Sequence, residues 1–88
     1  MKVVFLNSFK KDLKKVKSKA LKLKIKTCII SLENEENLRD IKSCKKLSGS
    51  YNVYRIRIGD YRLGFYLDDK TIFIGRFLKR SEIYRVFP

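Results

Sequence analysis

The sequence predicts an α+β domain whose elements follow the order strand, helix, helix and then three strands, β-α-α-β-β-β. Two periodicities support this class. From Phe9 to Leu32 apolar residues recur every three or four positions, as on one face of a helix. From Tyr51 onward they alternate with other residues, as in a strand. With 88 residues and no internal repeat, the chain is expected to form one small domain, residues 1–88.

The N-terminal half is predicted to be a strand followed by a helical hairpin. Residues 2–6 form a short apolar segment with two β-branched valines, as in a strand. Asn7 or Ser8 then offers a helix cap. Two apolar faces follow with shifted phase, and they consist of Phe9, Leu13, Val16 and Ala20, and of Leu21, Ile25, Cys28, Ile29 and Leu32. The shift predicts a break near residues 18–20.

The C-terminal half is predicted to hold three strands. An acidic cluster at residues 33–37 ends the second helix, and residues 38–46 are expected to contain another helical turn. After a break at residues 48–50, strands are predicted at about residues 51–58, 61–67 and 71–77. Gly59-Asp60 joins the first two of these strands, and residues 68–70 join the last two.

The Gly59-Asp60 hairpin indicates where the chemistry lies. A two-residue turn sets Arg57 opposite Arg62 and Arg55 opposite Gly64, so three arginines share one face of the sheet. Like charges directly opposite each other cost about 0.2 to 1 kcal/mol per pair, which suggests that an anion is the missing partner. Arginine suits a phosphate because its planar fork donates two hydrogen bonds and stays charged.

The register of the second hairpin is open in the sequence. A three-residue loop at residues 68–70 places Arg76 opposite Arg62 on the arginine face, whereas a two-residue loop sends Arg76 to the other side. We favour the three-residue loop, which adds Arg76 to the arginine face.

The charge indicates a polyanionic target. Lysine and arginine outnumber acidic residues 22 to 9, which gives a net charge of +13 and favours a nucleic acid, an anionic membrane or an acidic protein. A membrane is the weakest of these, because no apolar run approaches the roughly 20 residues that span a bilayer. Nine lysines between residues 10 and 26 form either a solvated helix face or a phosphate-contacting surface.

Several kinds of chemistry are not supported by the composition. The chain has no histidine, no metal-ligand spacing, no glycine-rich phosphate loop and no nucleophile beside a base, so neither a metal nor a cofactor is expected. Nothing suggests export, and Cys28 and Cys44 are therefore interpreted as reduced thiols of a cytoplasmic protein.

What remains is the arginine cluster and the tyrosines near it. Together they suit RNA, through phosphate contacts and base stacking, or phosphoryl transfer, through charge stabilisation. We interpret Tyr54 and Tyr61 as half-buried sheet residues. For Tyr66 and Tyr84, burial in the sheet and contact with RNA are equally supported.

Three motifs, taken with the order of the elements and an Asp-Asp-Lys turn, resemble a known family. They are Lys46-Leu47-x-Gly49, Tyr54-Arg55-Ile56-Arg57-x-x-Asp60-Tyr61-Arg62-Leu63, and Lys79-Arg80-Ser81-Glu82-Ile83-Tyr84. The pattern is similar to the RelE/ParE superfamily of toxins from type II toxin-antitoxin modules. The resemblance implies an antiparallel sheet of about four strands packed on the N-terminal helical hairpin. It also implies an acidic antitoxin that wraps and neutralises the toxin, in a complex that binds operator DNA.

The resemblance also implies a site. In the RelE branch the toxin enters the ribosomal A site and cuts mRNA without a metal, by attack of a 2′-hydroxyl on the adjacent phosphate. The expected catalytic residues on this chain are Arg57, Arg62, Arg80 and Tyr84. Contacts to RNA are expected from Arg55, Arg76, Lys79 and Tyr66.

The chain departs from the family pattern in its basic groups. Well-studied relatives have lysines at the positions of Arg55 and Arg57, and many carry a histidine where this chain has Lys79. Because a guanidinium is a poor general base, catalysis is expected to depend on orientation and charge stabilisation, unless the protein binds RNA without cutting it.

Three functions from different classes stay open. A ribosome-dependent mRNA endoribonuclease is favoured by the arginine face together with Arg80 and Tyr84. The alternatives are a ParE-like inhibitor of DNA gyrase, and a basic module without catalytic activity that acts only with its antitoxin on DNA.

Overall fold

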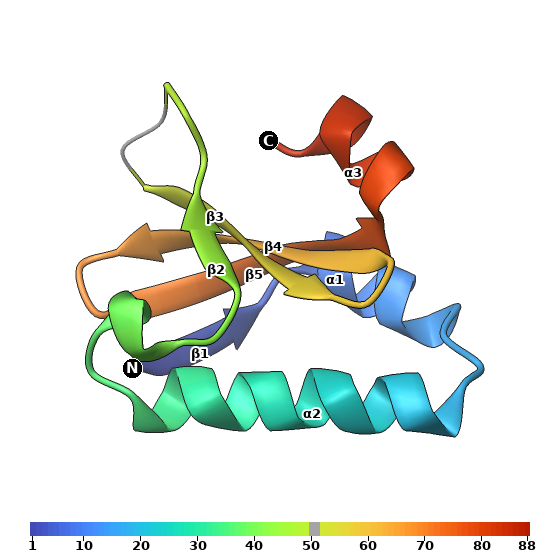
Figure 1. The fold of residues 1–88 in the computed structure, drawn as a ribbon, viewed down its shortest axis with the longest axis horizontal. Coiled ribbons are helices and arrows are strands. Elements are labelled where there is room, and N and C mark those ends of the chain that lie inside the picture. Colours follow the sequence, from blue (N-terminus) through green and yellow to red (C-terminus); the bar gives the residue numbers. More distant parts are fainter. Residues whose placement is uncertain (50–51) are drawn as a thin grey trace.

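The computed structural model describes residues 1–49 and 52–88 and confirms the α+β class (Figure 1). Within these residues five strands form one sheet in the spatial order β1-β5-β4-β3-β2. The strands are β1 (Lys2–Phe5), β2 (Cys44–Lys46), β3 (Val53–Ile58), β4 (Tyr61–Asp68) and β5 (Thr71–Lys79). The α-helices are α1 (Asn7–Lys14), α2 (Lys19–Asn34) and α3 (Arg80–Val86). In Figure 1, α2 runs below the sheet and α3 lies above it, so these helices cover opposite faces.

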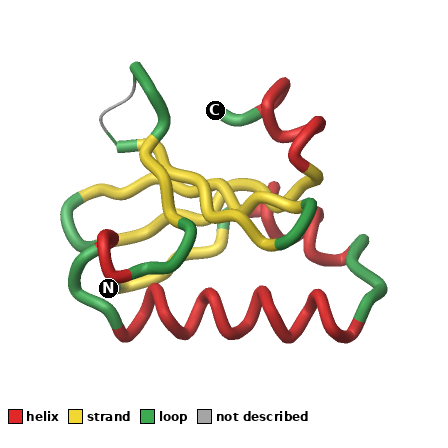
Figure 2. The backbone as a smooth tube through the Cα atoms, in the orientation of Figure 1, coloured by secondary structure: helices red, strands yellow, loops and turns green. Residues whose placement is uncertain are grey.

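The predicted helical hairpin is confirmed, with one local correction. Figure 2 shows the loop that separates α1 from α2, and the Ser18 hydroxyl caps α2 by accepting a hydrogen bond from the Leu21 N–H at 3.1 Å. The predicted cap of α1 is wrong, because α1 begins at Asn7 itself and no side chain caps it. Ser8 instead donates a hydrogen bond to the Gly75 carbonyl at 2.6 Å, which ties α1 to β5.

The predicted arginine hairpin is confirmed residue by residue. Ile58 pairs with Tyr61, Arg57 with Arg62, and Arg55 with Gly64. Gly59 has a φ of 59°, a value that glycine adopts without strain and that a tight turn between twisted strands requires. The alternation therefore buries the apolar face of the hairpin and leaves the arginines on the other face.

The sheet differs from the expectation in two respects. It has five strands within the described residues instead of about four, because residues 44–46 form β2 on the edge beside β3. The helical turn expected within residues 38–46 is present as a short 3-10 turn, Leu38–Asp40. The sheet is also not wholly antiparallel, since β1 runs parallel to β5. A polar edge strand of three residues, two of them lysines, gives little β signal, and such short, lysine-bearing edges limit unwanted strand pairing.

The second hairpin overturns the favoured register. Asp68 pairs with Thr71, so the loop contains two residues, and Asp69 takes a positive φ of 55°. A β-bulge between Gly64 and Phe65 then shifts the pairing, and Arg76 lies opposite Gly64 instead of Arg62. Because Gly64 also pairs with Arg55, Arg76 keeps the predicted face of the sheet although its predicted partner is wrong. A bulge adds one unpaired residue to a strand, which a count of loop residues does not reveal.

The ends of the strands also differ from the predicted ranges. The strand predicted at residues 71–77 extends to Lys79 as β5 and continues directly into α3. Two predicted boundaries lie outside the described residues. They are Tyr51, where the strand at about residues 51–58 was predicted to start, and Ser50, the last residue of the predicted break. The described strand β3 begins at Val53.

Apolar residues gather on both faces of the sheet. The main cluster packs α1 and α2 against the sheet, with Phe9, Ile25, Leu32, Leu63 and Phe65 among its fully buried members. A smaller cluster on the other face contains Val53, Ile83 and Phe87. It attaches α3 to the sheet. In the described part of the chain no helix is long and apolar enough to cross a membrane.

Candidate nucleic-acid interface

A cleft of about 890 Å³ lies on the arginine face, between α3 and the β2–β3 side of the sheet. Its basic lining consists of Lys45, Lys46, Arg55, Arg57, Arg62 and Arg80, and Tyr84 stands among them. Among the described residues that line the cleft, none is acidic. The cleft is therefore strongly cationic, and its hydrogen-bond donors suit an anion with several oxygen atoms.

Arg55 lies on the floor of the cleft and contacts two residues of the C-terminal segment, Phe87 and Tyr84. Its Nη2 donates a hydrogen bond to the carbonyl oxygen of Phe87 at 3.1 Å, and its Cζ lies 4.5 Å from the centroid of the Tyr84 ring. The Nε atom is buried, and no hydrogen-bond partner for it exists among the described residues. Stacking on Tyr84 and the single carbonyl contact therefore set the orientation of this guanidinium.

Arg57 and Arg62 lie side by side on β3 and β4. Arg62 is held by its own turn, because its Nη1 donates to the carbonyl oxygens of Gly59 at 3.0 Å and Tyr61 at 2.9 Å. Arg57 is exposed to solvent. Both side chains line the cleft from paired positions of the two strands, which suits a phosphate that contacts both.

Arg80 and Tyr84 project from successive turns of α3. Arg80 Nε donates a hydrogen bond to the Tyr84 hydroxyl oxygen at 3.0 Å, and Arg80 Cζ lies 5.5 Å from the ring centroid. This hydrogen bond, followed by the positive charges of Arg80, Arg62 and Arg55, lowers the pKa of Tyr84 below its usual value, although partial desolvation opposes the shift. Tyr84 is 50% exposed and therefore accessible to a ligand.

The structure brings five of the predicted site residues together and leaves three outside the cleft. Arg55, Arg57, Arg62, Arg80 and Tyr84 line the cleft. The three that do not line it are Arg76, Lys79 and Tyr66.

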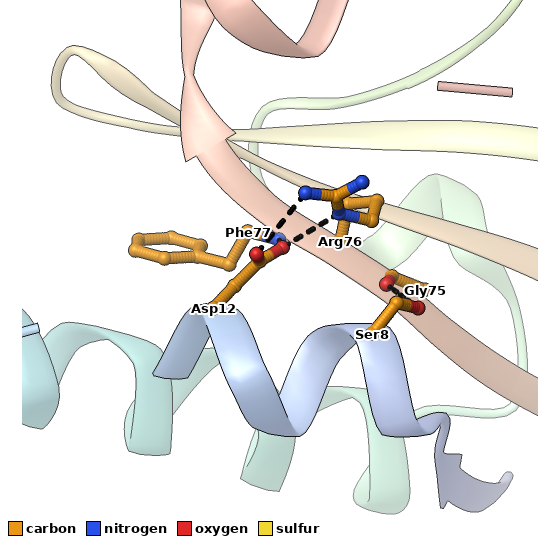
Figure 3. A network of polar contacts seen from close by, with 5 residues as sticks. All are labelled: Ser8, Asp12, Gly75, Arg76 and Phe77. Carbon is orange, nitrogen blue, oxygen red and sulfur yellow. Dashed lines mark hydrogen bonds and ion pairs between the residues drawn. The ribbon is translucent and has the colours of Figure 1, made fainter. Parts of the chain in front are cut away.

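Arg76 contacts α1 instead of the cleft (Figure 3). Its Nε donates to Asp12 Oδ2 at 2.8 Å and its Nη2 to Asp12 Oδ1 at 3.2 Å. Asp12 is 5% exposed and also accepts the Phe77 backbone N–H at 2.9 Å. The hydrogen bond to Asp12 is the main cause that raises the pKa of Arg76. Figure 3 shows the carboxylate of Asp12 between Arg76 and Phe77, at the edge of β5.

The remaining tyrosines and Lys79 have other surroundings. Tyr66 is half-buried and packs on Phe87 with ring centroids 5.2 Å apart, while Lys79 is exposed at the end of β5. Tyr54 and Tyr61 are half-buried sheet residues, as predicted, and stack on Phe65 and Phe77.

Sequence reasoning missed part of the cleft wall. Lys45 pairs with Arg55 across the short strand β2, and Lys46 pairs with Tyr54. No alternation indicates them, because Cys44 is half-buried and Lys45 and Lys46 are both exposed. Three residues with this pattern are not distinguishable from a loop.

The thiols show no sign of activation. Burial, reinforced by the proximity of Cys44, raises the pKa of Cys28 from 9.0 to about 11, and burial alone raises the pKa of Cys44 to about 11. Both side chains are therefore protonated at neutral pH. In the described residues no group of three or more histidine, cysteine or acidic side chains is placed to hold a metal ion.

Comparison with known proteins gives one consistent family. Residues 3–84 match the family described as ParE toxin of type II toxin-antitoxin system, parDE. Toxin RelE3 from Methanocaldococcus jannaschii is 44% identical over 89 residues, which cover 100% of both chains.

Solved structures agree with the sequence relatives. The crystal structure of the RelB-RelE antitoxin-toxin complex from Methanococcus jannaschii contains a chain that matches with a TM-score of 0.81 and 38% identity, covering 97% of this chain and 99% of that one. A chain of the archaeal RelE-RelB complex from Pyrococcus horikoshii OT3 matches with a TM-score of 0.74 and 28% identity, covering 91% and 94%. The protein therefore belongs to the RelE/ParE superfamily of toxins from type II toxin-antitoxin modules.

Proposed function

We propose that this toxin belongs to a RelBE-type module and acts in the cytoplasm as a ribosome-dependent, metal-independent endoribonuclease that cuts mRNA and arrests translation. The observation that carries the proposal is the cationic cleft, in which Arg55, Arg57, Arg62 and Arg80 surround Tyr84. The likeness to Toxin RelE3 and to chains of RelB-RelE complexes supports the RelE branch.

The proposed reaction is a transfer within the RNA. The ribose 2′-oxygen forms a bond to the adjacent phosphorus, the bond from phosphorus to the 5′-oxygen breaks, and a 2′,3′-cyclic phosphate is left. The 2′-hydroxyl loses its proton and the leaving 5′-oxygen gains one. Negative charge grows on the phosphate oxygens in between, so the reaction is accelerated by cations fixed beside them.

The arginines suit the charge-stabilising role. Arg57 and Arg62 are assigned to the phosphate oxygens, because they lie side by side and are directed into one cleft. Arg80 is assigned to the developing charge at the leaving oxygen, because it lines the same cleft from α3 and not from the strands that carry Arg57 and Arg62. None of them removes a proton, because a guanidinium stays charged at every physiological pH.

Tyr84 is assigned to the substrate base and to proton movement. Half of its surface is exposed, so the ring offers a stacking face for an RNA base. Its hydroxyl is bonded to Arg80 and its pKa is lowered, which makes the phenol a better proton donor and its anion more accessible.

RNA contact outside the cleft is proposed for Lys79 and not for Arg76 or Tyr66. Lys79 is exposed directly before Arg80 and extends the positive surface. Arg76 is neutralised by Asp12, and Tyr66 packs against Phe87, so we assign structural roles to both.

The partner is proposed to be an acidic, amphipathic segment of an antitoxin, docked between α1 and α2. A groove of about 740 Å³ there has an apolar floor that includes Phe5, Leu13 and Ile30, and Phe5 and Ile30 are exposed. Lysines rim the groove: Lys10, Lys14, Lys22 and Lys26. Apolar side chains on one face of a helix and carboxylates along its borders complement this surface. The complex, rather than the free toxin, is proposed to bind operator DNA.

Thermal unfolding tests the partner. The toxin bound to the antitoxin encoded beside it should melt at a higher temperature than the toxin alone, because the antitoxin binds the native state. Replacing Lys14 and Lys22 by glutamate should weaken the complex. A complex no more stable than the free toxin contradicts this part of the proposal.

Cleavage in cells tests the enzymatic proposal. The toxin is induced without its antitoxin, and the 5′ ends of a translated message are mapped by primer extension. Ends in register with the codons, lost when translation of that message is blocked, support a nuclease that works in the ribosomal A site. Growth arrest without new RNA ends contradicts it.

Inhibition of gyrase is the second candidate, favoured by the match of residues 3–84 to the ParE toxin family. It predicts a change in plasmid supercoiling and DNA damage on induction, with messages intact. Purified gyrase assayed for supercoiling with and without the toxin separates the two functions.

A further inference from the structure

Phe87 occupies a notch that two glycines leave open on the α3 face of the sheet. A Cβ atom placed on Gly64 meets the Phe87 ring at 2.5 Å from Cε2, 2.6 Å from Cδ2 and 2.9 Å from Cζ. A Cβ atom on Gly75 meets Cε1 of the same ring at 3.2 Å. Phe87 is 3% exposed, so the ring fills the notch and is sealed in it.

The notch lies beside the proposed RNA-binding cleft. Gly64 pairs with Arg55 on one side and with Arg76 on the other, so the Phe87 ring fills the place of a side chain in this row across the sheet. Arg76 reaches away from the cleft to Asp12. Arg55 stays in the cleft, and its Nη2 donates to the carbonyl oxygen of Phe87 itself.

Phe87 also anchors the helix that carries the other site residues. Its N–H donates to the Ile83 carbonyl at 2.9 Å and closes α3, which carries Arg80 and Tyr84. Ile83 and Phe87 are the buried residues of this C-terminal segment, and with Val53 they form the smaller apolar cluster. The position of Tyr84 over Arg55 therefore depends on how Ile83 and Phe87 pack against the sheet.

We propose that Phe87 is a positioning residue: its ring, seated on Gly64 and Gly75, and its carbonyl, bonded to Arg55, fix α3 so that Arg80 and Tyr84 lie over the arginine face. This inference rests on the proposed function for its catalytic consequence. The placement of Tyr84 is a property of the toxin itself, and it is testable whether or not RNA is cut.

The location of the small cluster separates positioning from general stability. The main core between the sheet, α1 and α2 does not include Phe87. Phe87→Ala should therefore release α3 while the rest of the domain stays folded, with the far-ultraviolet circular dichroism of the sheet and α2 retained. Val86→Ala is the matched control, because Val86 is the adjacent residue and is 48% exposed.

The first measurement is the ionisation of Tyr84, followed by NMR with 13C-labelled tyrosine and assigned with the Tyr84→Phe variant. In the native toxin and in Val86→Ala the pKa of Tyr84 should lie below that of an ordinary tyrosine. In Phe87→Ala it should rise part of the way toward the ordinary value, because the phenol moves away from Arg62 and Arg55 while Arg80, on the same helix, stays bonded to it. An unchanged titration in a folded Phe87→Ala variant overturns the proposal, whatever the enzyme assay shows.

The second measurement is a double-mutant cycle on the notch. Gly64→Ala should displace the ring and raise the pKa of Tyr84, and Gly75→Ala should do so less, since its Cβ has more room. In a Phe87→Leu background, where the smaller side chain leaves space, the effect of Gly64→Ala should largely disappear. Equal effects of Gly64→Ala in both backgrounds contradict a direct ring contact.

Single-turnover cleavage on programmed ribosomes gives the catalytic consequence. Misplacement of reacting groups by about 1 Å lowers rates by about 100-fold, so Phe87→Ala should lose about that factor in cleavage rate, with little change in half-saturating ribosome concentration. If the native toxin does not cut RNA, the proposed function fails, and the titration of Tyr84 still decides whether Phe87 positions α3.

Discussion

Arg57 and Arg62 face each other across β3 and β4, and this pairing indicates the function at the scale of single residues. Two like charges at directly opposed positions destabilise a sheet by about 0.2 to 1 kcal/mol. Every basic side chain that lines the cleft adds to that repulsion, and none of the described lining residues is acidic to offset it. A bound phosphate relieves this repulsion. The same repulsion between basic side chains therefore destabilises the free protein and favours the binding of an anion.

Replacing these arginines should separate toxicity from stability. Arg57→Ala removes an exposed charge, so growth inhibition should be lost while the free energy of unfolding changes by less than about 0.5 kcal/mol. Arg62→Ala should also abolish toxicity, with a loss of about 1 kcal/mol because two hydrogen bonds to the turn disappear. Growth after induction and urea unfolding measure the two effects.

Lysines on the helices provide the matched control. Lys14→Ala and Lys22→Ala, made in the toxin induced alone, should leave growth inhibition nearly intact, because these side chains lie on α1 and α2, outside the cleft. Equal loss of toxicity in the lysine and arginine variants is incompatible with a localised site.

A second prediction follows from the hydrogen bond between Arg80 and Tyr84. Arg80→Ala removes the main cause of the lowered pKa of Tyr84, which should therefore rise toward that of an ordinary tyrosine. Cleavage should fall more than ribosome binding. Stacking of the ring alone would make Tyr84→Phe mild, but the proton movement assigned to the hydroxyl should make it severe. Measuring the single-turnover rate from acidic to alkaline pH distinguishes the two roles, since only the second loses a pH-dependent step in Tyr84→Phe.

The cysteines give a prediction on pH. A pKa of about 11 in place of 9.0 lowers the thiolate fraction at pH 8 by about 100-fold, so alkylation of Cys28 and Cys44 should be slow in the native toxin and fast after unfolding. Because the folded pKa values are raised, the two thiols stabilise the fold below pH 9, and this contribution is lost as the pH rises through 11. Rapid alkylation of the native protein at pH 8 is the contrary result.

The edge of β5 shows how the elements are joined. β1 pairs with β5 only from Thr71 to Ile74, and beyond that point α1 covers the edge with side chains. Ser8 donates to the Gly75 carbonyl and Asp12 accepts the Phe77 N–H (Figure 3). Two polar residues of α1 thus satisfy backbone groups that a longer β1 would otherwise pair.

Asp12 should therefore be a stability residue. Asp12→Ala leaves the Phe77 N–H without its acceptor and Arg76 without its carboxylate, so the free energy of unfolding should fall by about 1 to 3 kcal/mol. Glu36→Ala, at an exposed position, is the control. Chemical denaturation that finds the two variants equally stable contradicts the role given to Asp12.

Local signals explain which elements were predictable. The register from Arg55 to Gly64 follows from a glycine turn and strict alternation, and the helical break at Ser18 follows from a phase shift. The five residues that share the cleft were predictable, because the hairpin sets three of them and the C-terminal motif supplies Arg80 and Tyr84.

Long-range effects explain the rest. The bulge at Gly64 and Phe65 depends on how β4 and β5 bend, and the pairing of Arg76 with Asp12 joins residues 64 positions apart. The strand β2 has only three residues and forms because β3 offers an edge. The anchoring role of Phe87 was not predictable, because the notch that holds its ring is formed by two glycines, Gly64 on β4 and Gly75 on β5.

At the scale of the whole molecule, the positive charge is distributed between two surfaces with different geometry. The lysines of α1 and α2 surround an apolar groove, which suits a protein helix, whereas the arginines line a polar cleft, which suits RNA. A net charge of +13 attracts both proposed partners, and the shape of each surface would select between them.

Single-turnover cleavage of mRNA on programmed ribosomes tests the central claim most directly. The native toxin should cut the message in the A site with no divalent ion beyond those that the ribosome needs, and it should leave a 2′,3′-cyclic phosphate. Arg57→Ala and Arg80→Ala should be strongly impaired at saturating toxin, and Lys14→Ala should cut at the native rate. An Arg57→Ala, Arg80→Ala double variant that cuts as fast as the native toxin would contradict the assignment of the cleft as the site of the reaction.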